Sequence, residues 1–128
     1  MDRNYEYNWN YYQWTIKCLK EDEKYEELAF FMLGVDLMLR QQEIIKLDFD
    51  QFIPHTCDKY KPVGINVSTL DVVKRLYAMG KVKLFDKSPI YYTNSIRESN
   101  GDMYFNGHMM RAIGLAIHPW DKENENDA

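Results

Sequence analysis

The chain has 128 residues, of which 45% are apolar and 28% charged, and its formal net charge is −4. This length is typical of one domain that folds without disulfides or metal. An aromatic content of 15% excludes an intrinsically disordered chain. We expect a single domain over residues 1–120, followed by a disordered acidic tail over residues 121–128.

Three further features indicate a cytoplasmic protein. The chain starts without a signal-peptide pattern, and its longest apolar run, Leu28 to Leu39, is too short for a bilayer, which needs ~20 residues. Cys18 and Cys57 are too few for a disulfide framework, so we expect reduced thiols. Lysine outnumbers arginine eleven to five, a bias typical of AT-rich coding DNA, which suggests a bacterium, a phage or a mobile element as the source.

Residues 4–20 predict a helix with two apolar stripes on opposite sides. One stripe has 4-3-4-3 spacing and consists of Tyr5, Trp9, Tyr12, Ile16 and Leu19. The other has 4-3-4 spacing and consists of Tyr7, Tyr11, Trp14 and Cys18. Either the helix is buried on both sides within one molecule, or one aromatic stripe is exposed to a partner.

Two more helices are predicted before residue 80. Residues 22–46 begin with an acidic turn and are apolar around nearly the whole circumference from Leu28 to Leu39, so we expect the central core helix there. Residues 47–67 are irregular because of prolines and a glycine, with a short strand near Phe49. Residues 69–79 predict a third helix, which begins after Ser68 and ends before Gly80.

The remaining segments favour β-structure. Residues 82–85 and 90–98 are rich in β-branched and aromatic residues, and Asn100-Gly101 is a strong hairpin signal before a return strand at 103–105. Residues 108–117 are ambiguous because Gly114 weakens a helical pattern, and we favour a strand. The predicted fold class is α+β, with an N-terminal helical pair and a third helix packed on a small antiparallel sheet.

The leading functional hypothesis is a small, non-enzymatic protein–protein interaction module. Tyr7, Tyr11 and Trp14 would anchor a protein partner, or a second copy of the chain in a homodimer, because aromatic side chains dominate interface energies. Acidic residues that follow the first helix would steer the encounter, namely Glu21, Asp22, Glu23, Glu26 and Glu27. With this composition, the hypothesis extends to a phage or mobile-element inhibitor of a host defence or nucleic-acid protein.

An alternative is a DNA-binding regulator that resembles a winged helix in its order of elements. Residues 61–97 hold seven bases and two acids, including Lys74, Arg75, Lys81 and Lys83, and the predicted hairpin follows them. The predicted hairpin tip carries two acids, and the whole chain is acidic, with a pI of about 5.3; both features count against this alternative.

A second alternative is a metal-dependent hydrolase that uses the carboxylates of Asp48 and Asp50. Such a pair is common by chance, and His55 with Cys57 lacks the second ligand pair of a zinc site. We therefore predict no metal site, no cofactor and no catalytic residues. Asp36, within the core helix, needs a partner, and we expect a structural bond to a tyrosine, tryptophan or arginine side chain.

Overall fold

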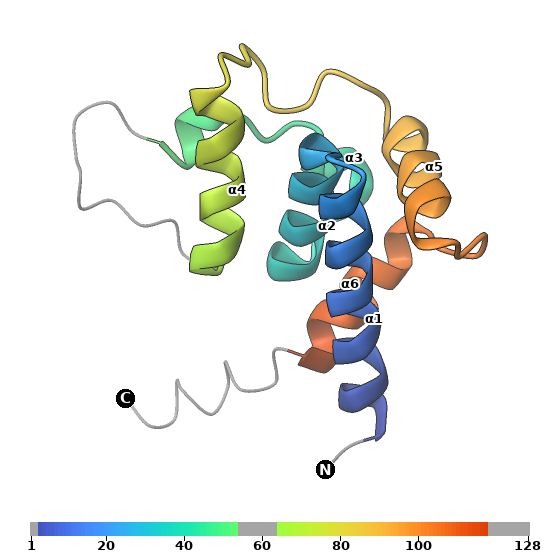
Figure 1. The fold of residues 1–128 in the computed structure, drawn as a ribbon. Helices are drawn as coiled ribbons and strands as arrows, with labels where there is room; N and C mark the ends of the chain where they lie inside the picture. Colours follow the sequence, from blue (N-terminus) through green and yellow to red (C-terminus); the bar gives the residue numbers. More distant parts are fainter. Residues whose placement is uncertain (1–2, 54–63, 118–128) are drawn as a thin grey trace, which may run out of the picture.

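A computed structural model describes residues 3–53 and 64–117, and over these ranges the chain is helical, with no strand (Figure 1). The elements are α1 (Arg3–Glu21), α2 (Tyr25–Leu37), α3 (Gln41–Ile44), the short 3-10 helix η1 (Phe49–Gln51), α4 (Val67–Ala78), α5 (Pro89–Asn100) and α6 (Gly107–Ile117). The predicted α+β fold with an antiparallel sheet is therefore wrong, and the part of the chain that the structure describes is all-helical.

The predictions for the first three helices hold, with shifted ends. α1 matches the expected helix, and α4 begins two residues earlier than expected, with Asn66 as its N-cap. α2 is buried on all sides from Glu27 to Asp36 and forms the centre of the core. It ends at Leu37 because Met38 adopts the left-handed conformation, with φ at 55°, so the predicted continuation to residue 46 is wrong.

The segment predicted as a strand and hairpin at residues 90–101 is helix α5. The Ser88 hydroxyl accepts a hydrogen bond from the Tyr91 backbone N–H, and Pro89 occupies the first turn, where its missing N–H costs nothing. At the other end, Gly101 has φ at 77°, and its N–H donates to the Arg97 carbonyl at 2.9 Å. Positive φ serves a helix end as well as a hairpin turn, and here Gly101 ends a helix, so the hairpin predicted at Asn100-Gly101 is wrong.

Residues 108–117, for which we favoured a strand, belong to helix α6. Its buried positions follow helical spacing; they are Gly107, Met110, Ile113, Gly114 and Ile117. Gly114 lies so close to the Val35 backbone carbonyl of α2 that a Cβ atom would clash with it, and also with Met38 Cγ at 2.6 Å. The glycine that weakens the local helix signal is therefore the residue that lets α6 approach α2.

The other expected strands are also absent. Residues 82–85 form an irregular segment that buries Leu84 and Phe85, and residues 103–105 belong to the turn before α6. Phe49, expected in a strand, begins η1, which Asp48 caps by accepting a 2.8 Å hydrogen bond from the Phe49 N–H. Cys57 and the predicted disordered tail lie outside the described residues.

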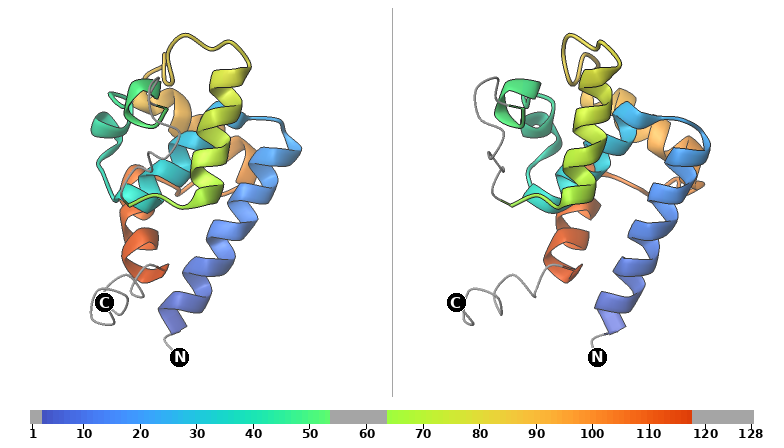
Figure 2. Two further views of the ribbon diagram at one scale, coloured as in Figure 1. Left: turned by 90° about the vertical axis from the view of Figure 1, so that its left-hand side faces the viewer. Right: turned by 60° about the vertical axis from the view of Figure 1, so that its left-hand side comes forward.

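α2 lies at the centre, and α4 and α5 lie on opposite sides of it (Figure 1). α1 packs against α2, α5 and α6. Its first turn lies near the last turn of α6, and its last turn lies at the other end of the molecule, where α1 joins α2 (Figure 2). One cluster of buried side chains joins these helices, with Phe30, Phe31 and Tyr92 among the largest. Among the described residues, no helix combines the length and the apolar character that crossing a membrane requires.

Candidate functional site

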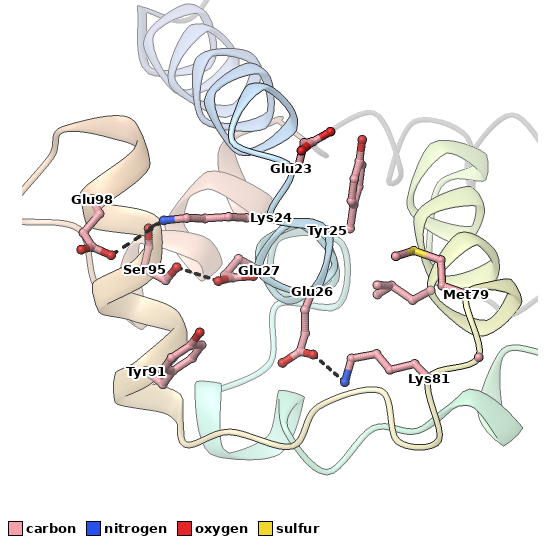
Figure 3. Close-up of a pocket in the computed structure, with 12 residues that line it drawn as sticks. Glu23, Lys24, Tyr25, Glu26, Glu27, Met79, Lys81, Tyr91, Ser95 and Glu98 are labelled. Atoms are coloured by element: carbon pink, nitrogen blue, oxygen red, sulfur yellow. Dashed lines mark hydrogen bonds and ion pairs between the residues drawn. The ribbon is translucent and has the colours of Figure 1, made fainter.

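An open cavity of about 660 Å³ lies where the N-terminal turn of α2 meets the C-terminal end of α4 and the outer face of α5 (Figure 3). We call this cavity the acidic groove; it is lined by Glu23, Lys24, Tyr25, Glu26, Glu27, Leu76, Met79, Gly80, Lys81, Tyr91, Ser95 and Glu98. Four of these residues are acids and two are lysines. Three of the acids, Glu23, Glu26 and Glu27, are residues for which the sequence predicted partner binding.

Glu26 is held in place by two partners. Its carboxylate lies 2.5 Å from the Lys81 ammonium and accepts a short hydrogen bond from the Tyr92 hydroxyl. The Tyr92 oxygen in turn accepts the backbone N–H groups of Asp86 at 3.1 Å and Lys87 at 3.2 Å. Burial, together with the bond to Glu26, raises the pKa of Tyr92 well above its usual value. This network fixes one wall of the acidic groove.

Glu27 is similarly fixed, on the side of the groove formed by α5. It is buried and accepts a 2.6 Å hydrogen bond from the Ser95 hydroxyl. The Lys24 ammonium donates to the Ser95 carbonyl at 3.0 Å and lies 3.8 Å from the exposed carboxylate of Glu98 (Figure 3). Glu26 is therefore paired with a lysine and Glu27 is hydrogen-bonded inside the protein, while the exposed acids of the rim are Glu23 and Glu98, of which Glu98 lies near Lys24.

Exposed apolar side chains accompany this charge. Met79, at the end of α4, is 65% exposed, and Tyr91 of α5 is about half exposed. A second hollow of about 330 Å³ shares Tyr91, Ser95 and Glu98 with the acidic groove and extends it to the exposed Met103. The surface therefore presents separated apolar side chains inside an acidic rim, an arrangement that suits a protein ligand.

The three predicted aromatic anchors lie on α1, and none of them lines the acidic groove. Tyr7 is 67% exposed and Trp14 is 52% exposed, whereas Cys18, in the same stripe, is a buried free cysteine. Tyr11 is half-buried against the end of α5. The structure thus separates the predicted partner residues into two surfaces, and the role of the aromatic stripe stays a prediction.

Tyr11 belongs to a polar network that joins α1 to the segment after α5. Its hydroxyl donates to the Asp102 carboxylate at 2.6 Å and accepts from the Asn100 amide at 3.1 Å, and the same amide lies 3.2 Å from the Thr15 hydroxyl. The indole N–H of Trp14 donates to the Asn100 carbonyl at 3.3 Å. Burial and the neighbouring Asp102 raise the pKa of Tyr11. Two of the three predicted anchors therefore have an internal role.

The predicted DNA-binding residues do not form one basic surface. The Arg75 guanidinium lies 4.1 Å from the centre of the Tyr25 ring, and Lys81 is paired with Glu26 and lies 3.6 Å from Asp86. Lys74 and Lys83 are exposed and form no ion pair among the described residues. The hairpin that was to serve as the wing is the end of α5.

The carboxylates considered for metal binding have other contacts. Asp48 caps η1 and accepts the Leu84 backbone N–H at 3.2 Å, and Asp50 is exposed. Over residues 3–53 and 64–117, no group of three or more histidine, cysteine or acidic side chains is placed to hold a metal ion. His55 and Cys57 lie outside the described residues.

Sequence reasoning missed Met79, Tyr91 and Glu98 as members of the site. The strand predicted at residues 90–98 does not place Tyr91 and Glu98 beside the start of α2, whereas helix α5 does. The signal that could have placed them is Ser88-Pro89, an N-cap residue followed by proline at the first helical position. Comparison of the chain with protein-family models, with curated proteins and with solved structures finds no match in any of the three.

Proposed function

We propose that this protein is a non-enzymatic binding module that takes a basic, partly apolar segment of another protein in the acidic groove. The observation that carries the proposal is the juxtaposition of Glu23 and Glu98 at the rim with the exposed side chains of Met79 and Tyr91. Apolar side chains exposed in one hollow are typical of a surface that is covered by a partner. The acids around them favour a partner with lysine or arginine residues.

The internal pairs of the groove support the same proposal. The Glu26–Lys81 pair and the Glu27–Ser95 bond hold the walls before a ligand arrives, so that little side-chain entropy is lost on binding. Burial of Met79 and Tyr91 would contribute roughly 25 cal/mol for each Å² removed from water. The charges of Glu23 and Glu98 would mainly accelerate the encounter, because exposed charges are screened by salt.

The hypothesis of a phage or mobile-element protein that inhibits a host protein gives this proposal a biological setting. Nucleic-acid enzymes present basic surfaces to their substrates, and such a surface has the charge that the acidic groove favours. The target itself stays a hypothesis, as does a second copy of the chain bound through Tyr7 and Trp14.

The probe that tests the groove is a synthetic helical peptide with a lysine face and a leucine face, titrated into the isotope-labelled protein. We expect saturable shifts in the amide signals of Tyr25, Met79 and Tyr91, and weaker binding as salt increases. A peptide of the same length with glutamate in place of lysine should not bind.

Two charge-reversal variants separate the groove from the overall charge of the protein. The double variant Glu23→Lys with Glu98→Lys should weaken binding about tenfold, since it makes the rim repel the probe. The matched control, Glu6→Lys with Asp71→Lys, changes exposed acids outside the groove by the same amount. If the control weakens binding as much as the rim variant does, only the net charge matters, and the groove is not the binding site.

A further inference from the structure

Another cavity, of about 300 Å³, lies between α3 and the first turns of α6, and the residues that line it are polar or charged except for one glycine. It is lined by Arg40, Gln41, Gln42, Asn106, Gly107, His108 and Arg111. No acidic side chain is among these residues, although the chain as a whole has a formal net charge of −4. The cavity is therefore a positive concave site on an acidic protein.

The two arginines at this cavity differ from the other arginines whose side chains the structure describes. Arg75 stacks on Tyr25, and Arg97 donates to the Phe105 carbonyl at 2.7 Å. Arg40 and Arg111 form no side-chain hydrogen bond or ion pair with any described residue. Both guanidinium groups therefore have their full set of N–H donors available, and both line the same cavity.

Neighbouring residues add donors and fix the shape of the cavity. His108 and Arg111 are three residues apart on α6, so they lie on one face of the helix. The side-chain amide oxygen of Gln41 accepts a hydrogen bond from the Thr93 hydroxyl at 3.1 Å. The N–H groups of the same side-chain amide are left as donors. The absence of a side chain at Gly107 makes room for Gln41, since a Cβ atom there would lie 3.2 Å from its Cδ.

The acid nearest in sequence to Arg40 does not neutralise the cavity. Glu43 accepts the Arg40 backbone N–H at 2.9 Å, and it is not among the lining residues. That bond orders the start of α3, so it holds the backbone of Arg40 in place without occupying the guanidinium group.

We propose that this cavity binds the phosphoryl group of a small phosphate ester. Two guanidinium groups with amide and imidazole donors suit a phosphoryl group, because arginine binds its oxygens in a fork of paired hydrogen bonds. The observations favour a small ester over a nucleic acid. A net negative chain repels a long polyanion, and Lys81 and Arg75, which could have extended a positive surface, are engaged elsewhere.

The proposal is tested by an NMR titration of the labelled protein with inorganic phosphate and with O-phosphoserine, at constant ionic strength in a phosphate-free buffer. We expect saturable shifts at Gly107, His108 and Arg111 with both probes, and no comparable shifts with chloride. The double variant Arg40→Gln with Arg111→Gln should weaken binding about tenfold or more. It should fold normally, because both side chains are exposed and form no hydrogen bond or ion pair with a residue that the structure describes.

Two further variants separate specific recognition from general attraction. Lys74→Gln with Lys83→Gln removes the same charge elsewhere and should leave binding within about twofold of the original. Arg40→Lys with Arg111→Lys keeps the charge but not the fork, and should bind less tightly than the original protein.

Three results would overturn the proposal. One is a linear response to phosphate without saturation; another is equal loss of binding in the Lys74 and Lys83 control. The third is a DNA duplex that binds through the same residues while neither phosphate nor phosphoserine does, which would assign the cavity to nucleic acid. None of these results bears on the acidic groove, whose residues do not line this cavity.

Discussion

The Thr69 hydroxyl donates a 2.6 Å hydrogen bond to the buried carboxylate of Asp36, and this contact joins the end of α2 to the first turn of α4. The same carboxylate accepts the backbone N–H of Asn66 at 2.9 Å and its side-chain amide at 3.0 Å. Asn66 is the N-cap of α4 but forms no side-chain cap of its own. Asp36 therefore caps α4 from a different helix, where its negative charge also suits the helix dipole.

Replacement of Asp36 by alanine should lower the free energy of unfolding by roughly 2–4 kcal/mol, because several donors lose a buried, charged acceptor. Urea denaturation followed by circular dichroism measures the effect. Asp71→Asn, an exposed change on α4, is the matched control and should stay within about 0.5 kcal/mol of the original protein. Equal stability of the two variants would show that Asp36 does not hold α4.

Replacement of Gly114 by alanine should destabilise the protein by roughly 1–3 kcal/mol or more, although alanine favours a helix more than glycine does. The reason is that the Val35 backbone carbonyl and the Met38 side chain lie close to Gly114. The carbonyl cannot move away from an added Cβ atom without displacing α2. Thermal unfolding measures the change. Leu115→Ala, at an exposed position of the same helix, should have little effect; a stabilised Gly114→Ala protein would contradict the close crossing of α2 and α6.

The aromatic stripe of α1 should divide into a structural part and an exposed part. Tyr11→Ala combined with Trp14→Ala should cost roughly 2–4 kcal/mol of stability, because the bonds to Asp102 and Asn100 are lost together with buried area. Tyr7→Ala should leave stability almost unchanged. Light scattering on the Tyr7→Ala protein then tests self-association without the complication of unfolding. If the double variant were as stable as the original protein, the stripe would be a surface feature throughout.

Stability should decrease at alkaline pH because of buried tyrosines. Burial and the Glu26 bond raise the pKa of Tyr92, and burial together with the charge of Asp36 raises that of Tyr12, both from an ordinary value of 10.0. Below pH 10 both states keep these protons and the contribution is complete. Above pH 10 the unfolded chain releases them while the native protein does not, so the free energy of unfolding falls as the pH rises toward the native pKa values.

The slope for each such tyrosine approaches about 1.4 kcal/mol per pH unit in that window. Urea denaturation at a series of pH values measures the slope. Tyr92→Phe should lower the slope by the contribution of one tyrosine. Tyr7→Phe, at an exposed position, should leave the slope unchanged. An unchanged slope in Tyr92→Phe would show that the Tyr92 hydroxyl ionises normally in the folded protein.

The sequence by itself was enough to locate α1, the core character of α2, and α4. In α1 and α4 the apolar residues recur at helical spacing, whereas in α2 they cover the whole circumference, and the first turns of α1 and α2 are acidic. It also singled out Glu23, Glu26 and Glu27, although it could not tell what they would lie beside. The charge of that surface follows from composition, but its shape does not.

The tertiary structure decided α5 and α6, although Ser88-Pro89 marks the start of α5 in the sequence. Their residues have high β-propensity, or contain a glycine, so local preference favours strands. Packing overrides that preference: Tyr92 and Ile96 of α5 are fully buried, and Gly114 gains the close approach to α2 that compensates for its poor helix propensity. Both candidate binding sites depend on these two helices, which supply Tyr91 and Glu98 to one and His108 and Arg111 to the other. Neither site was visible in the sequence, because long-range packing brings its residues together.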